Sequence, residues 1–245
     1  MKAFLRKGFG LALLFFFGIN ATHAQLDFSK FEIGLTGGIF VYQGDLTPSP
    51  FGSYRTMRPT VNLFVNRILN PSLSLRTSLF YGGLSGSDAA YENPAWRQQR
   101  SFTFKARTFE LSELLVWNAW SRDRKFVPYV FGGIGLSFLE IQRDWSNFNG
   151  EFFSTENLAS RLTEDIAHET PKLIPVVSVG IGFQYPLRNN LYIIAETAYR
   201  FTRTDYLDGF SKAANPELYD HYQSHTIGVL YRFGKKSSLN CPTTF

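Results

Sequence analysis

Apolar and polar residues alternate along several segments of this chain, so that every second side chain is apolar. The first such segment places Phe31, Ile33 and Leu35 on one side and Glu32 and Thr36 on the other. Similar alternation runs through residues 73–81, 191–202 and 226–233. A period of two residues is typical of a β-strand whose two faces meet different surroundings. These four segments are therefore predicted to be strands.

Four further segments, at about 59–67, 102–118, 127–140 and 174–186, bring the number of predicted strands to eight. The connections alternate in length along the chain. Three are short, at about 69–71, 121–124 and 187–190, and four are long, at about 43–58, 83–100, 141–173 and 204–221. Outer-membrane barrels have short periplasmic turns and longer extracellular loops. The pattern predicts an all-β fold, an eight-stranded antiparallel up-and-down transmembrane β-barrel with four long extracellular loops and both termini in the periplasm.

The segment 102–118 departs from simple alternation. Glu113 falls in phase with the apolar residues Phe109, Leu111, Leu115 and Trp117. A β-bulge shifts the phase of a strand by one residue. We therefore expect a bulge in this segment.

The third long loop contains Leu158, Leu162 and Ile166 at four-residue spacing, after Ser154 and Thr155. This spacing predicts a short amphipathic helix over the mouth of the barrel, with the two hydroxyl residues as caps. An irregular loop with chance spacing is the alternative.

Alternation alone does not distinguish a membrane barrel from a soluble β-sandwich or a soluble barrel. Charged residues and glycines, however, share the face that we assign to the lumen, where a narrow barrel needs small or mutually paired side chains. The residues are Glu32, Arg76, Glu196 and Arg200, with Gly132, Gly180 and Gly182. An eight-stranded barrel is filled by its own side chains, so we predict an internal ion-pair network of these four charges rather than a conducting pore.

The N-terminus has the features of a secretory signal peptide. Lys2, Arg6 and Lys7 precede an apolar run at 11–19, and small residues follow at 22–24. The run is shorter than the roughly 20 residues of a membrane-spanning helix, which makes an uncleaved anchor the weaker alternative. We expect a signal peptide at 1–24, a barrel domain at 25–234 and a periplasmic tail at 235–245.

Charge and composition narrow the class of protein further. Three of the net five positive charges belong to the signal, so the remaining chain is nearly neutral and gives no reason to expect nucleic-acid binding. Aromatic residues make up 17% of the chain, as suits a membrane barrel. The single cysteine, Cys241, excludes an internal disulfide.

Few residues offer catalytic chemistry, and we expect no enzyme, no cofactor, no metal and no soluble substrate. His225 and Ser224 are adjacent, but neighbouring strand residues point to opposite faces and do not readily share a hydrogen bond. Asp205 and Asp208 have the oxygen ligands that calcium prefers. Turn-forming aspartates at a strand exit explain them equally well, and we favour that interpretation.

Several stretches resemble, in the same order, a family of Bacteroidota outer-membrane barrels that includes PorG of the type IX secretion system. Residues 42–46, Tyr-Gln-Gly-Asp-Leu, are similar to the Tyr-x-Gly-Asp-Leu motif of the family, and residues 204–208, Thr-Asp-Tyr-Leu-Asp, to its signature after the seventh strand. Segments 100–105, 109–112 and 128–133 and the Cys-Pro of the tail also match. The motif residues are Tyr42, Gly44, Asp45, Thr204, Asp205, Tyr206, Asp208, Cys241 and Pro242.

The chain departs from the family at two places. Gly209 replaces a second aspartate, and the third loop lacks a Thr-Glu-Gly-Gln-Gly stretch, which leaves room for a paralogue with another partner. The resemblance implies a non-catalytic component of the secretion system that contacts outer-membrane lipid and periplasmic ring proteins, the latter through the tail. The alternative is a barrel that binds or transports a small ligand or lipid through its aromatic loops, which contain Tyr91, Trp96, Trp145 and Phe148.

Overall fold

The computed structural model of the chain describes residues 27–120, 124–215 and 219–234. The predicted signal peptide and C-terminal tail therefore lie outside the described residues. Eight strands make up most of the described chain: β1 (Phe31–Gln43), β2 (Arg58–Ile68), β3 (Leu73–Ser87), β4 (Thr103–Asn118), β5 (Val127–Asp144), β6 (Leu173–Arg188), β7 (Leu191–Thr202) and β8 (His221–Arg232).

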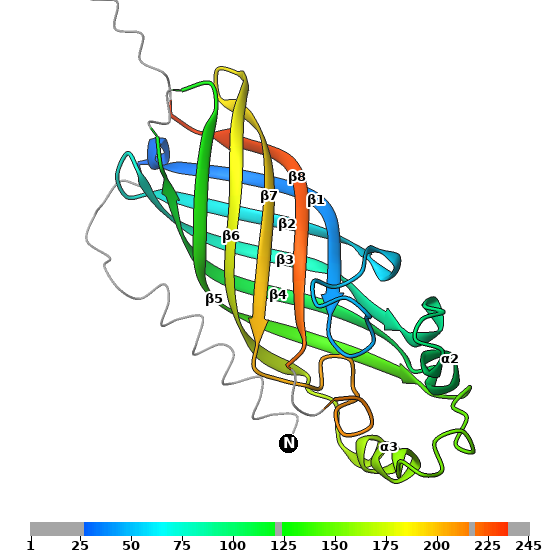
Figure 1. The fold of residues 1–245 in the computed structure, drawn as a ribbon. Coiled ribbons are helices and arrows are strands. Elements are labelled where there is room, and N and C mark those ends of the chain that lie inside the picture. Colours follow the sequence, from blue (N-terminus) through cyan, green and yellow to red (C-terminus); the bar gives the residue numbers. More distant parts are fainter. Residues whose placement is uncertain (1–26, 121–123, 216–218, 235–245) are drawn as a thin grey trace, which may run out of the picture.

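The strands form one closed antiparallel barrel in which each pairs with its neighbours in sequence and β8 pairs with β1 (Figure 1). The fold class expected from the alternation is thus confirmed. The register of the strand pairs can be followed once around the barrel, from each residue to its partner on the next strand. This path starts at Phe138 on β5, passes Gly37 on β1 and returns to β5 at Pro128, ten residues before its starting point. This displacement tilts the strands against the barrel axis, and the tilt is visible in Figure 1.

The long and short connections lie at opposite ends of the barrel (Figure 1). The long-loop end consists of loop 1 (residues 44–57), loop 2 (88–102), loop 3 (145–172) and loop 4 (203–220). These loops carry η2 (Tyr54–Thr56), η3 (Asp88–Ala90), α2 (Trp96–Arg100) and α3 (Leu158–Ala167). At the short-turn end, η1 (Phe28–Lys30) precedes β1, and the backbone N–H of Phe233 donates to the carbonyl of Phe31. Both ends of the barrel domain therefore lie at the short-turn end.

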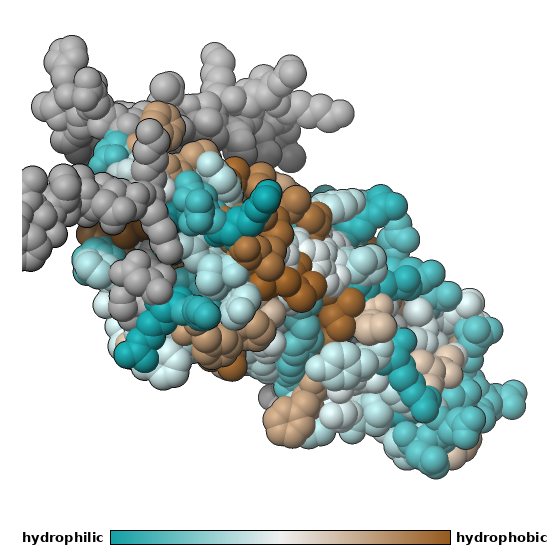
Figure 2. Space-filling model, turned by 90° about the horizontal axis from the view of Figure 1, so that it is seen from above, coloured by the Kyte–Doolittle hydropathy of each residue, from teal (hydrophilic) through white to brown (hydrophobic). Residues whose placement is uncertain are grey.

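The two faces of the wall follow the predicted alternation. On β4 the residues with even numbers are buried and those with odd numbers are mostly exposed. Figure 2 shows hydrophobic residues gathered over the middle of the visible face and hydrophilic residues towards the long-loop end. Within the described residues, no helix is long and apolar enough to cross a membrane.

The bulge expected in β4 is wrong, because β4 pairs with β3 and β5 without any shift in register. Glu113 instead remains on the outer face, where its Oε2 accepts a hydrogen bond of 2.8 Å from the Thr77 hydroxyl of β3. A cross-strand hydrogen bond thus accommodates the polar residue that we attributed to a bulge. The only register shift among the described strand pairs lies between Pro186 and Arg188 of β6.

Three further expectations need correction. Gly132 lies in phase with the exposed Val130 and Ile134 and so faces outwards, whereas Gly180 faces the lumen as expected. Strands β3 and β5 continue to Ser87 and Asp144, several residues beyond the predicted ends. Their last residues extend past the shorter strands at the long-loop end, at the lower right of Figure 1, and lead into loops 2 and 3.

The helix predicted in loop 3 is confirmed as α3, with Leu158 and Leu162 buried and Ile166 exposed. Its expected caps are wrong. The residue before the first turn is Asn157, whose backbone is left-handed, with φ at 53°, and whose side chain makes no capping hydrogen bond. Ser154 and Thr155 lie too far upstream, in a turn that precedes the helix.

Candidate functional site

The lumen contains two charge clusters, the first towards the short-turn end. Arg76 of β3 lies at its centre, 2.5 Å from the Glu196 carboxylate of β7 and 4.0 Å above the Phe64 ring. Arg76 also donates to Asn66, which in turn donates to Glu32 of β1. Because Asn66 links the two charges, Glu32, Arg76 and Glu196 belong to one hydrogen-bonded chain.

The second cluster lies nearer the long-loop end and holds Arg200 of β7. Its Nε donates to Glu110 of β4 at 2.6 Å, and one terminal nitrogen donates to the Ser224 hydroxyl at 2.8 Å. Tyr222 also donates to Glu110, at 2.8 Å. The guanidinium lies 4.4 Å above the Phe80 ring. Arg200 is 1% exposed, so this ion pair is shielded from bulk water.

The structure therefore places all four predicted lumen charges inside the barrel but pairs only Arg76 with Glu196 directly. Glu32 pairs with Arg232, and Arg200 with Glu110, neither of which we singled out from the sequence. The two cavities beside these clusters hold only about 10 Å³ each. The described side chains thus fill the lumen at both levels.

The two motif stretches, 162 residues apart, come together on the long-loop side of these clusters. The Tyr42 hydroxyl lies 2.7 Å from Oδ2 of Asp208 and 2.6 Å from Oδ1 of Asp220, and all three side chains are buried. A neutral phenol has one hydrogen to donate. Because both contacts are short, one carboxyl group has to carry a proton and donate to the tyrosine oxygen. Burial raises the pKa of Asp208 and of Asp220 well above the ordinary range, as this arrangement requires.

Gly44 and Asp45 bring loop 1 against this cluster. A Cβ atom on Gly44 would lie 1.9 Å from Oδ1 of Asp220 and 2.2 Å from the Tyr42 hydroxyl oxygen, so only glycine fits here. The carboxylate of Asp45 accepts from the backbone N–H of Asn215 at 2.7 Å. Asp45 therefore joins loop 1 to loop 4, and burial raises its pKa to about 6.

Buried aspartates also tie the other loops together. Asp88 of η3 pairs with Arg97 at 2.8 Å and with Arg100 at 2.6 Å. Both arginines also donate to the backbone carbonyl of Asp45, which attaches loop 2 to loop 1. Asp165 of α3 accepts three backbone N–H bonds from residues 211–213, which attaches loop 3 to loop 4. We call loops 1 to 4, held by these contacts, the cap.

Asp205 differs from the other aspartates of the cap. It is 9% exposed, and neither carboxylate oxygen has a donor at hydrogen-bond geometry. Burial raises its pKa to about 7, and the nearby Ser211 hydroxyl offsets this only in part. No group of three or more potential metal ligands is found among the described residues. Asp205 is thus a buried carboxyl group that is most stable when neutral.

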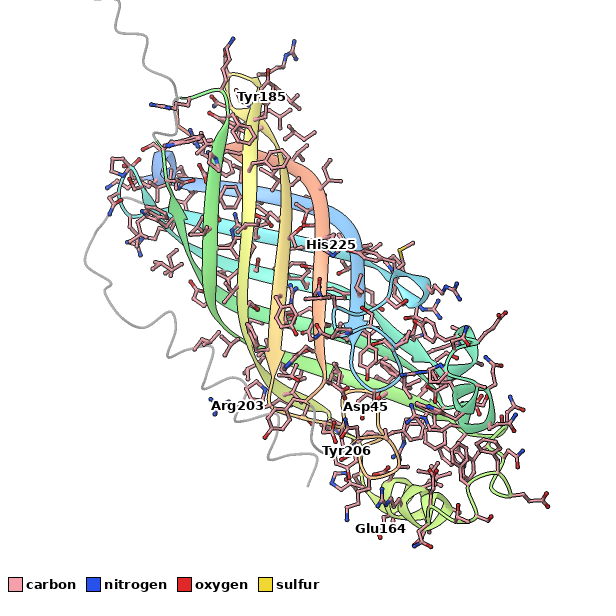
Figure 3. The ribbon with its side chains drawn as sticks, in the orientation of Figure 1. Asp45, Glu164, Tyr185, Arg203, Tyr206 and His225 are labelled. Atoms are coloured by element: carbon pink, nitrogen blue, oxygen red, sulfur yellow. The ribbon has the colours of Figure 1, made fainter. Side chains whose placement is uncertain are left out.

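The remaining motif residues are less central. Thr204 accepts from the Tyr206 N–H through its hydroxyl, and the Tyr206 ring stacks on His168 at 4.1 Å. Figure 3 shows Tyr206 and Asp45 together at the long-loop end, with Tyr185 at the opposite end. Cys241 and Pro242 lie outside the described residues.

Sequence reasoning missed several residues that hold these clusters. They are Asp88, Arg97, Arg100, Glu110, Asp165 and Asp220. Only Glu110 has a usable signal in the sequence, because it falls in the lumen phase of β4 with Thr108 and Ser112. The others lie in loops or at a loop end, where no periodicity marks them.

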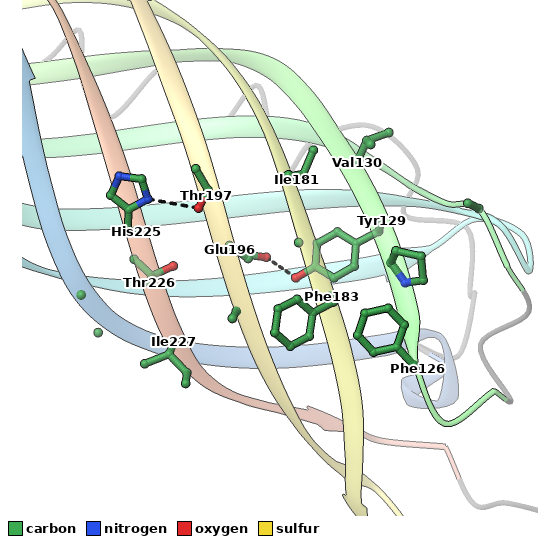
Figure 4. A pocket seen from close by; sticks show the side chains of 16 residues that line it. Phe126, Tyr129, Val130, Ile181, Phe183, Glu196, Thr197, His225, Thr226 and Ile227 are labelled. Carbon is green, nitrogen blue, oxygen red and sulfur yellow. Dashed lines mark hydrogen bonds between the residues drawn. The ribbon is translucent and has the colours of Figure 1, made fainter. Parts of the chain in front are cut away.

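The outer wall has a depression of about 700 Å³ across β5 to β8 and β1 (Figure 4). Its lining includes Gly37, Gly38 and Ala195, whose small or absent side chains leave this part of the wall hollow. His225 lies at its edge, with one ring nitrogen 3.1 Å from the Thr197 hydroxyl and the other 3.0 Å from that of Tyr54. Ser224 points into the lumen instead and accepts from Arg200.

Comparison with solved structures finds barrels at low sequence identity. Neisserial surface protein A has 14% identity and a TM-score of 0.46, with 83% of this chain and 97% of that chain covered. The outer membrane protein OprG from Pseudomonas aeruginosa has 9% identity and a TM-score of 0.46, with 82% and 94% covered. PagL, described as an outer membrane enzyme, has 10% identity and a TM-score of 0.40, with 82% and 98% covered.

Among curated proteins no match is found. A family model described as "Outer membrane protein beta-barrel domain" matches residues 9–233, which is nearly the whole chain. The alternating wall, the closed eight-stranded topology and this match agree with one another. The chain belongs to the family of outer membrane protein β-barrel domains.

Proposed function

We propose that this barrel is a non-catalytic, PorG-like structural component of the type IX protein secretion system, with its long loops extracellular and both termini in the periplasm. The observation that carries the proposal is the convergence of the two motif stretches on one buried cluster. Tyr42 contacts Asp208, and the Gly44 backbone leaves no room for a side chain beside Asp220. Residues that match the family motif thus form one structural unit, which supports the proposal.

The filled lumen supports a role in interaction rather than conduction. The Arg76 and Arg200 clusters occupy the interior at two levels, and the cavities beside them hold only about 10 Å³ each. A barrel filled in this way offers surfaces to partners rather than a wide aqueous channel. In the proposed orientation the periplasmic surface consists of the short turns and the tail at 235–245, and its partners are the periplasmic ring proteins of the system.

Deletion of the gene tests this function. We expect a strain without it to retain the cargo of the type IX system inside the cell, and a plasmid copy of the full-length chain to restore export. As a control, outer-membrane barrels unrelated to the system should be assembled normally in the same strain. Normal cargo export in the deletion strain would contradict the proposal.

A second candidate function is the binding of a small ligand by the cap. A cavity of about 650 Å³ lies between loops 2, 3 and 4, with both aromatic and charged residues in its lining. These include Trp96, Phe152, Arg100, Arg161 and Glu156. Its size and its mixture of apolar and polar groups suit a small molecule. This function predicts that removal of residues 150–156 abolishes activity while removal of residues 235–245 does not, the reverse of the secretion role.

A further inference from the structure

Glu113 is a carboxylate on the lipid-facing side of the wall, at the middle of its strand. The outward positions of β4 run through Phe109, Leu111, Glu113, Leu115 and Trp117, and the four neighbours are 44–50% exposed. Exposed aromatics mark the two interfaces of a membrane barrel. Since Phe109 and Trp117 each lie four residues from Glu113, the carboxylate lies about 10 Å from either interface along the membrane normal.

The chain itself satisfies this carboxylate only in part. Oε2 accepts from the Thr77 hydroxyl of β3, and the residue paired with Glu113 on β5 is the exposed Ile134. No basic side chain of the described residues forms an ion pair with Glu113, and the nearest cation along β4, Arg107, pairs with Glu140 instead. Among the described residues, the bond from Thr77 is thus the only hydrogen bond or ion pair of Glu113.

A charged group in this position is costly unless a donor or cation joins it, and ionisable residues at membrane depth tend to mark functional sites. Lipid headgroups do not supply the donor, because they lie at the interfaces and Glu113 lies midway between them. The neighbouring side chains Leu79, Leu111 and Leu115 are apolar and offer no donor. A carboxyl group left alone there would take up a proton, whereas a basic side chain on a protein segment embedded at the same depth would keep it charged.

We propose that the outer face of β3 and β4 around Glu113 and Thr77 is a docking surface for a second membrane-embedded protein that presents a basic side chain to the Glu113 carboxylate. The leucines on either side supply a flat apolar contact, and the carboxylate supplies the charge that selects the partner. This surface is independent of the periplasmic contacts of the secretion role, so either proposal can fail without the other.

The proposal is tested by photo-crosslinking in intact outer membranes. A benzoylphenylalanine probe at Leu111 lies beside the carboxylate, and the same probe at Val229 of β8 lies on the opposite wall as a control. We expect Leu111 to yield one protein adduct of discrete mass and Val229 to yield none. The captured peptide should come from a membrane-embedded segment that contains lysine or arginine.

The variants Glu113→Leu and Glu113→Lys test whether the protein captured at Leu111 binds through the Glu113 carboxylate or lies nearby by chance. Both should abolish the Leu111 adduct, while Glu113→Gln, which keeps a hydrogen-bonding group, should retain part of it. Since Glu113→Leu removes a polar group from the lipid face, this barrel should fold into phosphatidylcholine vesicles at least as well as the unmodified chain. Adducts with lipid alone, or a protein adduct that persists in Glu113→Leu, would overturn the proposal.

Discussion

At the scale of single residues, the hydroxyl of Tyr42 has the most consequential position, between two buried carboxyl groups. We predict that Tyr42→Phe destabilises the contact between β1 and loop 4 by about 1–3 kcal/mol, because both carboxyl groups lose a buried hydrogen-bond partner. Amide hydrogen exchange in residues 204–215 measures the effect.

The matched control for this substitution is Tyr231→Phe, which removes a hydroxyl from an exposed position on β8. It should leave exchange in loop 4 unchanged. Equal protection of loop 4 in Tyr42→Phe and in the unmodified chain would show that the hydroxyl does not hold the cap.

The raised pKa values of Asp45, about 6, and Asp205, about 7, predict that the cap loosens as the pH rises. A carboxyl group whose pKa is raised by folding binds its proton more tightly in the folded state. The contribution of the protonated carboxyl group to the stability of the cap is therefore fully present below about pH 4, which is the ordinary pKa of an aspartate. It is lost as the pH rises through 6 to 7, the raised pKa values in the folded chain. Hydrogen exchange of the cap, corrected for the intrinsic rate, should be faster at pH 8 than at pH 5.

Asp205→Asn isolates the part of this effect that belongs to one residue. The amide stays neutral, so the variant should protect loop 4 better than aspartate at pH 8 and about equally at pH 4. The comparison is made between the two proteins at each pH. Weaker protection in the variant at pH 8 would mean that the carboxylate is stabilised in its charged form.

Gly209 is the loop 4 residue at which the chain departs from the family motif. Its φ is +85°, and a Cβ atom would lie 2.3 Å from the Arg143 side chain. Gly209→Ala should thus destabilise the cap by about 1–3 kcal/mol, measured by limited proteolysis of loop 4. Gly150→Ala is the control, because its Cβ would meet only Phe148, at 3.6 Å. Similar cleavage of both variants would contradict the steric argument.

At the scale of elements, the ion pair between Arg200 and Glu110 connects β7 to β4 across the lumen. Removal of one partner leaves a buried charge, so Arg200→Met should cost about 3–5 kcal/mol. Arg200→Met combined with Glu110→Gln should cost less than the sum of the two single changes. Urea unfolding of the barrel from lipid vesicles provides the measurement.

The exposed pair of Arg107 and Glu140, 3.8 Å apart on neighbouring strands, is the control for the lumen pair. Because surface ion pairs contribute at most about 1 kcal/mol, Arg107→Met should shift the urea midpoint little. Additive effects of the two lumen substitutions would indicate that Arg200 and Glu110 do not depend on each other.

The strands and their faces could be predicted from the sequence because alternation depends only on which side of the wall each residue occupies. The exact ends of β3 and β5 could not, since near the long-loop end the outward positions of these strands hold glycine, serine and other polar residues, and the segments resemble loops. Glu113 was misread because its Thr77 partner lies on another strand. Pairings such as Arg200 with Glu110 depend on the register between distant strands, which the local pattern does not specify.

The candidate site was predicted only in part. The motif residues Tyr42, Gly44, Asp45 and Asp208 were identified by resemblance, and the structure gathers them in one cluster. Their partners Asp220 and Asn215 both lie in loop 4, where no sequence pattern marks them. The fit of Gly44 against Asp220 is a tertiary contact, which the sequence around either residue does not indicate.

At the scale of the whole molecule, the barrel combines a filled lumen, an apolar wall and a cap in which four loops are tied together by buried aspartates. A barrel filled beside both charge clusters is consistent with the proposed role in a larger complex. In that proposed role, the short-turn end and the tail would contact periplasmic partners.

The most direct test of this account is purification of the tagged full-length chain from native outer membranes after gentle crosslinking, with mass spectrometry of the associated proteins. The account predicts recovery of the periplasmic ring proteins of the type IX system, and their loss when residues 235–245 are removed. Recovery of the barrel alone, at good yield and after efficient crosslinking, would contradict the account and favour a ligand-binding role for the cap.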